Sequence, residues 1–326
     1  MWIASSFDQV RTPMQAALGN FDGIHLGHRQ VIAPVLPPST PAPGSDLDTP
    51  RIYSTVLTFS PHPKEFFSGQ PKALLTPVAE KAQYLDRLGV EQLALLPFNR
   101  ELATLSPEAF IEQILVQKLQ VQSLSVGQDF CFGAKRSGTA EHLQAIAARY
   151  NIPVVITPLQ SLNQERISSS AICDALMMGD VARAQGLLGR PYVIQGEVVR
   201  GQQLGRTLGF PTANLKLPPQ KFVPRQGVYG VWVRNLSAPN WPPLAGVMNI
   251  GTRPTIVGQH QTLEVHIFPQ RLTPTLPPLH LYGQTLAVEL VKFLRPEHKF
   301  NSLDELKAQI AKDCAIAHDV LLNPPA

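Results

Sequence analysis

Cysteine is scarce in this sequence: Cys131, Cys173 and Cys314 are the three in 326 residues. An odd number at wide spacing excludes the disulfide framework of small secreted domains and predicts a reducing compartment. Long hydrophobic runs are lacking as well, since none approaches the roughly 18–20 residues that a membrane-spanning helix needs. Residues 1–11 show no basic segment followed by an apolar core. We therefore expect no secretory signal, no membrane partner and a cytoplasmic location.

An excess of one charge is also lacking. The 28 Lys and Arg residues only slightly outnumber the 24 Asp and Glu residues, which leaves a net charge of +4. No dense Lys/Arg tract is present, so nucleic acid is not an expected partner, whereas a mild positive excess suits small anionic ligands. Hydrophobic residues make up 44% of the chain and charged residues 16%. This composition is typical of a globular protein, and the length is sufficient for two domains.

The first half alternates strand-like and helix-like segments, which predicts an α/β domain with a parallel sheet. Thr76 and Ser106 each precede a proline and are expected to cap the helices that follow. The proline-rich stretch 34–50 is expected to be an exposed loop. The expected strands are 16–18, 52–59, 92–97, 124–127 and 153–157, and the expected helices are 76–88, 106–119, 140–150, 168–178 and 181–188.

From Tyr192 onward the pattern changes to short β-rich runs separated by Gly and Pro. This predicts a small antiparallel β-barrel, and an apolar stripe in residues 301–318 predicts a terminal helix. The expected strands are 193–199, 228–233, 244–250, 263–268 and 286–293. We therefore expect an α/β domain over residues 1–186 and a β domain over residues 187–326. The two patterns differ and no internal repeat is present, which indicates two unrelated folds.

The most informative stretch reads G-N-F-D-G-I-H-L-G-H at residues 19–28, between a strand-like and a helix-like segment. A glycine-rich turn in that position brings backbone N–H groups and a helix N-terminus close to phosphate oxygens. The stretch matches neither the Walker A nor the G-x-G-x-x-G pattern. It contains two histidines, His25 and His28, whose imidazoles can donate hydrogen bonds to the charge that builds up on an attacked α-phosphate. The alternative is a pair of solvated polar or capping residues.

Three further segments of the first half suit the same ligand. His62 lies in S-P-H-P at the end of an expected strand, where open α/β sheets bind ligands, although a solvated turn histidine is the alternative. In G-Q-D-F-C-F-G at 127–133, Asp129 can accept hydrogen bonds from a ribose or adenine edge. The phenylalanines there are either pocket walls or core residues. Ser168 and Ser169 begin a helix whose capped N-terminus can hold phosphate oxygens.

The second half has its own signature, G-Q-Q-L-G-R-T-L-G-F-P-T-A-N at residues 201–214. Thr212 and Asn214 are two positions apart, so on a strand their oxygens share a face, and such hard ligands suit Mg²⁺. Glu264 is the carboxylate that we expect to act as general base on an attacking hydroxyl; the alternative is a solvated carboxylate. The other residues expected to form this nucleotide loop are Gly201, Gly205, Arg206 and Gly209.

The 19–28 stretch resembles the H-x-G-H signature of nucleotidylyltransferases, in the form typical of bacterial FMN adenylyltransferases. The 201–214 stretch resembles the riboflavin kinase module, as do G-V-M-N-I-G-T-R-P-T at 246–255 and L-E-V-H-I-F at 263–268. The resemblance implies a Rossmann-like nucleotidylyltransferase domain joined to a kinase barrel. It implies phosphorylation of riboflavin to FMN by ATP and then adenylylation of FMN to FAD with release of pyrophosphate, with Mg²⁺ as the metal.

The resemblance also implies roles for single residues. It places the flavin-binding flap of the kinase at Arg295 and Phe300, and it points to Glu264 as the base. The sequence departs from the family at Cys173, where an arginine is usual, and in the proline-rich stretch 269–280. Candidates to replace that cation are Lys135, Arg136 and Arg166. The implied ATP contacts of the adenylyltransferase are Asn20, Phe21, Asp22, Gly27, His62, Asp129, Ser168 and Ser169.

Two other functions remain open from the residues alone. One is an adenylyltransferase for another substrate, such as a nicotinamide or pantetheine phosphate, joined to an unrelated barrel. The other is a flavin- or RNA-binding barrel protein without catalysis, for which the replacement by Cys173 is the supporting feature. We expect small-molecule partners only, and a monomer or weak homo-oligomer.

Overall fold

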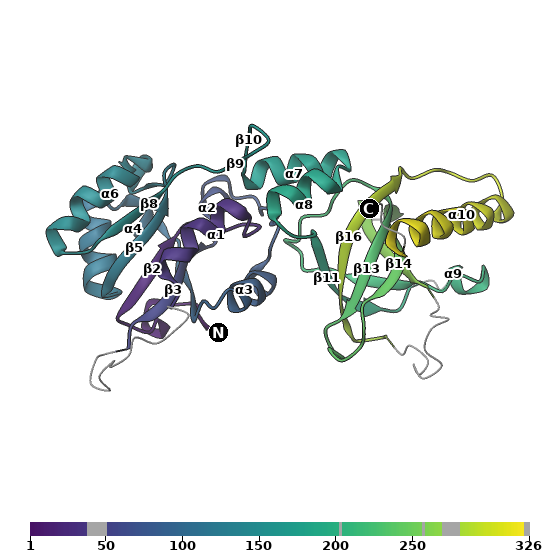
Figure 1. The fold of residues 1–326 in the computed structure, drawn as a ribbon, viewed down its shortest axis with the longest axis horizontal. Helices are drawn as coiled ribbons and strands as arrows, with labels where there is room; N and C mark the ends of the chain where they lie inside the picture. Colours follow the sequence, from purple (N-terminus) through teal and green to yellow (C-terminus); the bar gives the residue numbers. More distant parts are fainter. Residues whose placement is uncertain (38–50, 202–203, 256–257, 269–280, 323–326) are drawn as a thin grey trace. The chain divides into compact units, whose positions relative to one another are not determined.

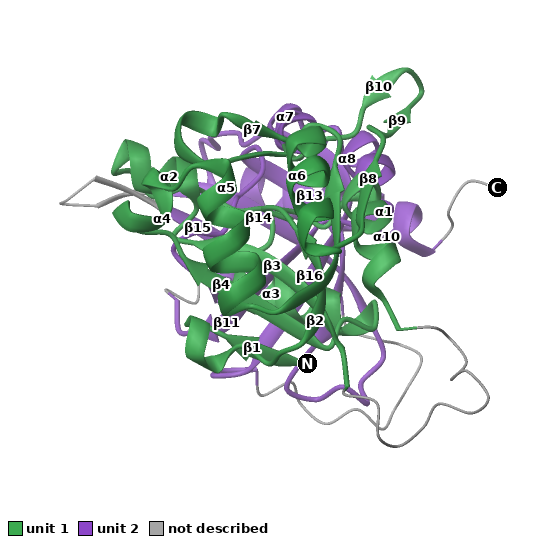
Figure 2. Cartoon of the chain, turned by 90° about the vertical axis from the view of Figure 1, so that its left-hand side faces the viewer, with its two compact units in different colours: residues 1–169 green, residues 170–326 purple. Residues whose placement is uncertain are grey.

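A parallel sheet organises the first part of the chain, with the strand order β1-β4-β3-β2-β5-β8. Figure 1 labels its strands β2, β3, β5 and β8. The structure is a computed structural model that describes residues 1–37, 51–201, 204–255, 258–268 and 281–322. Residues 1–169 and 170–326 form two compact units, coloured separately in Figure 2. The sheet strands are β1 (Trp2–Ala4), β2 (Met14–Leu18), β3 (Tyr53–Ser60), β4 (Gln92–Pro97), β5 (Val121–Gly127) and β8 (Val154–Thr157).

Both faces of this sheet are buried. Neighbouring residues of a strand point to opposite faces, so Val56 and Leu57 belong to two different hydrophobic clusters. The helices of this unit are α1 (Leu26–Ile32), α2 (Pro63–Ser68), α3 (Val78–Arg87), α4 (Arg100–Thr104), α5 (Pro107–Ala109) with the π-helix Phe110–Lys118, and α6 (Ala140–Ala147). Two hairpins complete the unit, β6 (Cys131–Phe132) with β7 (Gly138–Thr139) and β9 (Ser161–Leu162) with β10 (Glu165–Arg166).

The second unit is built on a closed antiparallel barrel in the order β11-β12-β15-β14-β13-β16. One end helix, α10, packs on β13 and β14 through Val228, Val247 and Ala317. The strands are β11 (Val193–Val199), β12 (Ala213–Lys216), β13 (Gly227–Asn235), β14 (Leu244–Thr255), β15 (Gly258–Ile267) and β16 (Thr285–Arg295). The helices are α7 (Ser169–Met178), α8 (Val181–Leu188), α9 (Leu204–Thr207) and α10 (Leu303–Leu322).

The predicted fold class is confirmed in both halves, and the differences are local. The predicted cap of α3 was wrong, because Pro77 occupies the N-cap while the Thr76 hydroxyl accepts the backbone N–H of Gly23 at 2.8 Å. Strands β1 and β12, of three and four residues, were not predicted. The contacts divide the chain at residue 169 and so group α7 and α8 with the barrel. Residues 38–50 and 269–280 of the two proline-rich stretches lie outside the described part.

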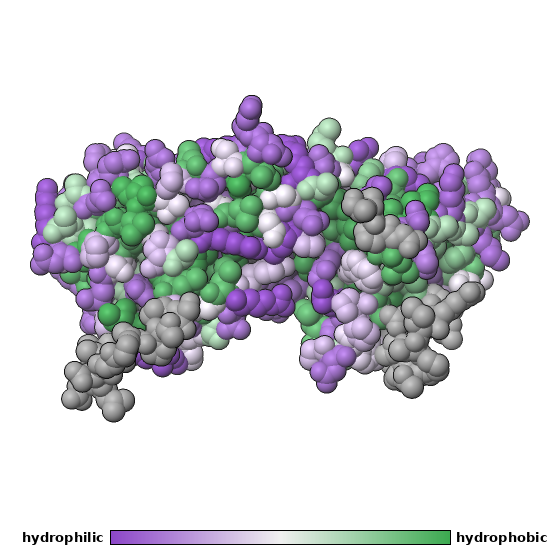
Figure 3. All heavy atoms as spheres, viewed as in Figure 1, coloured by the Kyte–Doolittle hydropathy of each residue, from purple (hydrophilic) through white to green (hydrophobic). Residues whose placement is uncertain are grey.

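Hydrophilic and hydrophobic residues are interspersed over both units on the face that Figure 3 shows. The β9–β10 hairpin at the top of that view is hydrophilic. Within the described residues, no helix combines the length and the apolar character that crossing a membrane requires.

Candidate functional site

The loop of residues 19–25 leaves β2 at its carboxyl end. In the strand order, β3 and β4 lie on one side of β2, whereas β5 and β8 lie on its other side. Such a switch point is where open α/β sheets bind ligands. Phe21 and Ile24 are buried and have left-handed backbones, with φ of 48° and 43°. Bulky residues rarely adopt this conformation, so the surrounding contacts must hold the loop in it.

Those contacts come from three elements outside the loop. The Lys81 ammonium donates to the Asn20 carbonyl at 2.7 Å, and the Ser169 hydroxyl donates to the Asp22 carbonyl at 2.8 Å. The Asp22 side chain is buried and accepts the Thr76 backbone N–H at 3.1 Å. Three of the predicted residues, Asn20, Asp22 and Ser169, are therefore brought together, although the last lies 147 positions from Asp22 in the chain.

The two histidines lie against each other. The His25 and His28 rings stack with centroids 3.5 Å apart and an angle of 14° between their planes. His25 is buried and also caps α1, because its Nδ1 accepts the His28 backbone N–H at 3.2 Å. A Cβ on Gly27 would lie 3.3 Å from the His25 ring, which explains the glycine between them. The edge of Phe21 packs on His28 at 5.3 Å. The capping alternative therefore holds for His25, and it fixes the orientation of the pair.

A cluster of cations lies beside this loop, and the sequence analysis did not identify it. The Lys72 ammonium is 3.9 Å from the Asp22 carboxylate and 3.1 Å from Nε2 of His62. Burial lowers the pKa of Lys81 to about 8, although the Asp22 charge opposes this shift. Burial also lowers the pKa of His62 to about 4, and the charge of Lys72 adds to the effect. No motif marks either lysine, so only the fold reveals the cluster.

The 127–133 segment follows β5 at the same edge of the sheet. Asp129 forms an ion pair with Arg166 of β10, so this arginine neutralises a predicted ligand-binding carboxylate. The Phe130 and Phe132 rings stack at 5.8 Å, and Phe132 is buried against the core. The core alternative therefore holds for Phe132. Ser168 lies just before the first residue of α7.

In the barrel, the predicted kinase residues meet across neighbouring strands. Asn214 of β12 pairs with Glu264 of β15, and Glu264 pairs on its other side with Asn249 of β14. The Thr212 hydroxyl donates to the Glu264 carboxylate at 3.3 Å. A Cβ on Gly201 would lie 2.5 Å from Cγ of Asn214, so the Gly201 backbone lies directly against that amide. Asn249 was not predicted, although it stands in the 246–255 stretch.

The remaining predicted kinase residues make separate contacts. Arg295 is held by Asp313, a buried residue of α10, through three hydrogen bonds of 2.9, 3.0 and 2.7 Å. Its guanidinium carbon lies 5.8 Å from the Phe300 ring centroid. Gly205 accepts the Phe210 backbone N–H at 2.8 Å and so closes the turn after α9. Gly209 has a φ of 87°, and the Arg206 side chain lies outside the described part.

Comparisons with known proteins match the two halves of the chain to two different families. The FAD synthetase family matches residues 8–171, and the riboflavin kinase family matches residues 188–321. The bifunctional riboflavin kinase/FMN adenylyltransferase of Escherichia coli K12 is 41% identical over 311 residues, covering 95% of this chain and 93% of that protein. This chain belongs to the bifunctional riboflavin kinase/FMN adenylyltransferase family.

Further relatives of the same description support this membership. The protein of Haemophilus influenzae is 41% identical over 92% of both chains, and that of Bacillus subtilis is 36% identical over 94% of this chain and 91% of its own. A crystal structure described as a macrolide-efflux protein from Streptococcus pneumoniae covers 99% of both chains with a TM-score of 0.78 and 29% identity. The family predicted from the motifs is therefore confirmed.

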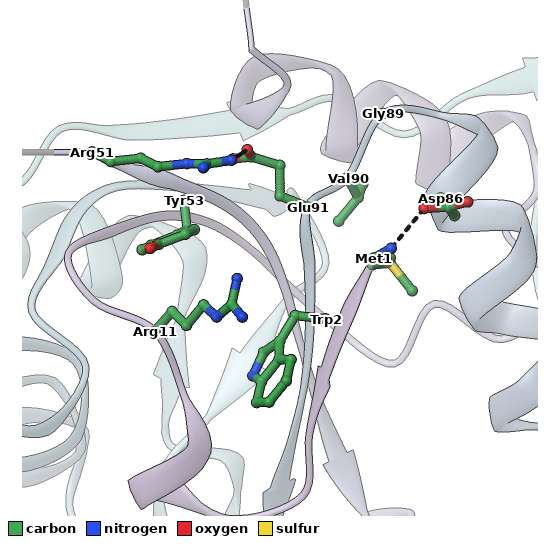
Figure 4. A pocket seen from close by; sticks show the side chains of 9 residues that line it. All are labelled: Met1, Trp2, Arg11, Arg51, Tyr53, Asp86, Gly89, Val90 and Glu91. Atoms are coloured by element: carbon green, nitrogen blue, oxygen red, sulfur yellow. Dashed lines mark hydrogen bonds and ion pairs between the residues drawn. The ribbon is translucent and has the colours of Figure 1, made fainter.

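One pocket of this bifunctional family member lies away from both candidate sites. It has a volume of about 520 Å³ and is lined by residues at or just before the first residues of β1, β3 and β4, by Arg11 ahead of β2 and by Asp86 of α3 (Figure 4). The Arg11 guanidinium lies 4.4 Å from the Trp2 ring, and Arg51 lies 5.2 Å from the Tyr53 ring. Arg51 also pairs with Glu91 at 2.5 Å. The pocket is at the amino ends of the strands, whereas the histidine loop is at their carboxyl ends, so we do not assign adenylyl transfer to it.

Proposed function

We propose that the two activities of this family use the two clusters described above. FMN is adenylylated at the 19–28 loop, and riboflavin is phosphorylated at the cluster of Thr212, Asn214 and Glu264. The supporting observation is that each cluster lies inside the matching family segment, residues 8–171 for the synthetase and 188–321 for the kinase. We place the boundary between the two activities at residues 186 and 187, between these segments.

In the kinase, Glu264 acts as the general base. Its carboxylate accepts the proton of the terminal ribityl hydroxyl as that oxygen attacks the γ-phosphorus of ATP, and the bond between the γ-phosphorus and the β,γ-bridging oxygen breaks so that ADP leaves. Two contacts support this role: the hydrogen bond from Thr212 to the Glu264 carboxylate at 3.3 Å, and the strand pairing of Glu264 with Asn214. They bring Glu264 next to the proposed nucleotide loop. The glycine turn at Gly201 and Gly205 lets the backbone approach the phosphates.

Mg²⁺ is the metal that these residues fit. The donors are a hydroxyl, an amide and a carboxylate, all of which offer hard oxygen ligands. The Gly201 backbone lies against the Asn214 amide, in space that a Cβ at residue 201 would fill. Thr212 and Asn214 would hold the ion. When bound, it supplies positive charge that offsets the phosphate oxygens of ATP.

In the synthetase, an FMN phosphate oxygen attacks the α-phosphorus of ATP. The new P–O bond forms as the bond to the pyrophosphate oxygen breaks, and no covalent enzyme intermediate is required. His25 and His28 donate hydrogen bonds to the charge on the α-phosphate. Asn20, Phe21, Asp22 and Gly27 form the loop that positions them, and the other predicted contacts are His62, Asp129, Ser168 and Ser169. The stacking of the two histidine rings, and the capping of α1 by His25, support this arrangement.

A double dissociation tests the two-site proposal. Glu264→Gln should lower riboflavin kinase activity by roughly 10²–10⁴-fold, the usual contribution of a general base, and leave the adenylylation of supplied FMN intact. His28→Ala should do the reverse. The matched controls are Glu197→Gln and His142→Ala, at exposed residues of β11 and α6. Chromatography of riboflavin, FMN and FAD after incubation with Mg-ATP measures both reactions. Equal loss of both activities in one folded variant would refute the assignment.

We further propose a cytoplasmic protein that acts as a monomer or weak homo-oligomer and binds no nucleic acid. The small positive excess of +4 supports small anionic partners. Light scattering after size-exclusion chromatography tests the oligomeric state, and absence of a shift with RNA or DNA at low salt tests the exclusion of nucleic acid.

A further inference from the structure

His62 can carry a proton on only one of its ring nitrogens. It caps α2, and its Nδ1 accepts the Lys64 backbone N–H at 3.0 Å. A neutral imidazole has one accepting nitrogen and one N–H group, so the proton of this ring is on Nε2. The burial that lowers the pKa of His62 to about 4 agrees with a neutral ring at pH 7.

The Lys72 ammonium faces this same Nε2 at 3.1 Å. An ammonium group has three N–H donors and no acceptor, so two donors meet at a distance where one of them should be an acceptor. Two donors that converge in this way are stabilised by an anionic oxygen that accepts from both, and such charge-assisted hydrogen bonds are the strong ones. The Lys72 side chain is 29% exposed, so a ligand can reach it.

The protein itself supplies only part of the missing negative charge. Oδ2 of Asp22 lies 3.9 Å from Nζ of Lys72, which is too far for a hydrogen bond. The other oxygen of Asp22 already accepts the Thr76 backbone N–H. A second cation, Lys81, is close enough to lower the pKa of His62 further. The donor pair therefore lies in a positive environment, next to the loop to which Asp22 belongs.

We propose that Nζ of Lys72 and Nε2 of His62 together bind a phosphate oxygen of a substrate during adenylyl transfer. Lys72 is a substrate-binding residue that no motif marks. The inference rests on the proposed function of the 19–28 loop. The shared chemistry is a phosphate oxygen, which comes either from the polyphosphate of ATP or from the phosphate of FMN.

Steady-state kinetics of the full-length Lys72→Met variant, with supplied FMN and Mg-ATP, test the proposal. Loss of a hydrogen bond to a charged group predicts a rise of roughly 10- to 100-fold in the affected constant. If the oxygen belongs to ATP, the KM for ATP and the inhibition constant of inorganic pyrophosphate rise, and the KM for FMN does not. If it belongs to FMN, only the KM for FMN rises. Lys72→Arg should restore most of the affinity, because it keeps the cation.

The control is Lys64→Met, which removes an exposed charge whose field also reaches His62. It should leave all three constants at the wild-type values. Riboflavin kinase activity of the same protein should not change in any variant. If Lys72→Met also leaves the three constants unchanged, the inference is overturned. If the wild-type chain itself forms no FAD from FMN, the proposed function fails instead.

Discussion

Gly201 has no room for a side chain, and this gives a sharp test of the proposed kinase site. Its backbone is not in the left-handed region, so alanine can adopt its conformation and the effect of Gly201→Ala is steric. The added Cβ would lie 2.5 Å from Cγ and 2.6 Å from Oδ1 of Asn214, whereas ordinary contacts begin at 3.4 Å. The Asn214 amide must therefore move by about 1 Å, a misplacement that can cost on the order of 10²-fold in rate.

The assay for this variant is riboflavin kinase kcat/KM, with adenylylation of supplied FMN measured on the same protein. We expect the kinase value to fall by about 10²-fold and the adenylylation rate to stay unchanged. The matched control is Gly230→Ala in β13, whose added Cβ would meet Ala317 at an ordinary 3.7 Å. Wild-type kinase activity in Gly201→Ala would refute the view that this turn positions Asn214.

Two further predictions concern buried charges. Burial lowers the pKa of Lys81 from 10.5 to about 8, so the native state releases its proton before the unfolded state does. Stability should therefore rise with pH between these values, by up to ~3 kcal/mol relative to Lys81→Met; parallel denaturation curves for the two proteins would contradict this. Asp313→Ala removes the partner of Arg295 and should lower the free energy of unfolding by about 3–5 kcal/mol. Urea unfolding, followed through the loss of kinase activity, measures this change. An unchanged midpoint would show that the pair is dispensable.

The sequence predicted most of the fold because its patterns are local. Strand β4 was predicted to the residue, because an apolar run bounded by turn residues indicates a strand from neighbouring positions alone. Strand β12 was missed because it begins inside the P-T-A-N segment, which directly follows a glycine-rich loop and was interpreted as a turn. The Thr76 cap failed for a different reason. A distant backbone N–H, that of Gly23, uses its hydroxyl instead.

The sequence by itself determined the family, the two fold classes and the two motifs that we propose to bind phosphate, because short glycine, histidine and threonine patterns carry their chemistry within a few positions. Only the tertiary structure decided which partners they have. The contact between Thr212 and Glu264 spans 52 positions, and the support of Asn20 by Lys81 spans 61. Such contacts depend on strand order and register, which no local pattern specifies. For the same reason, the donor pair of Lys72 and His62 became visible only when α2 and the segment after it were folded against the loop.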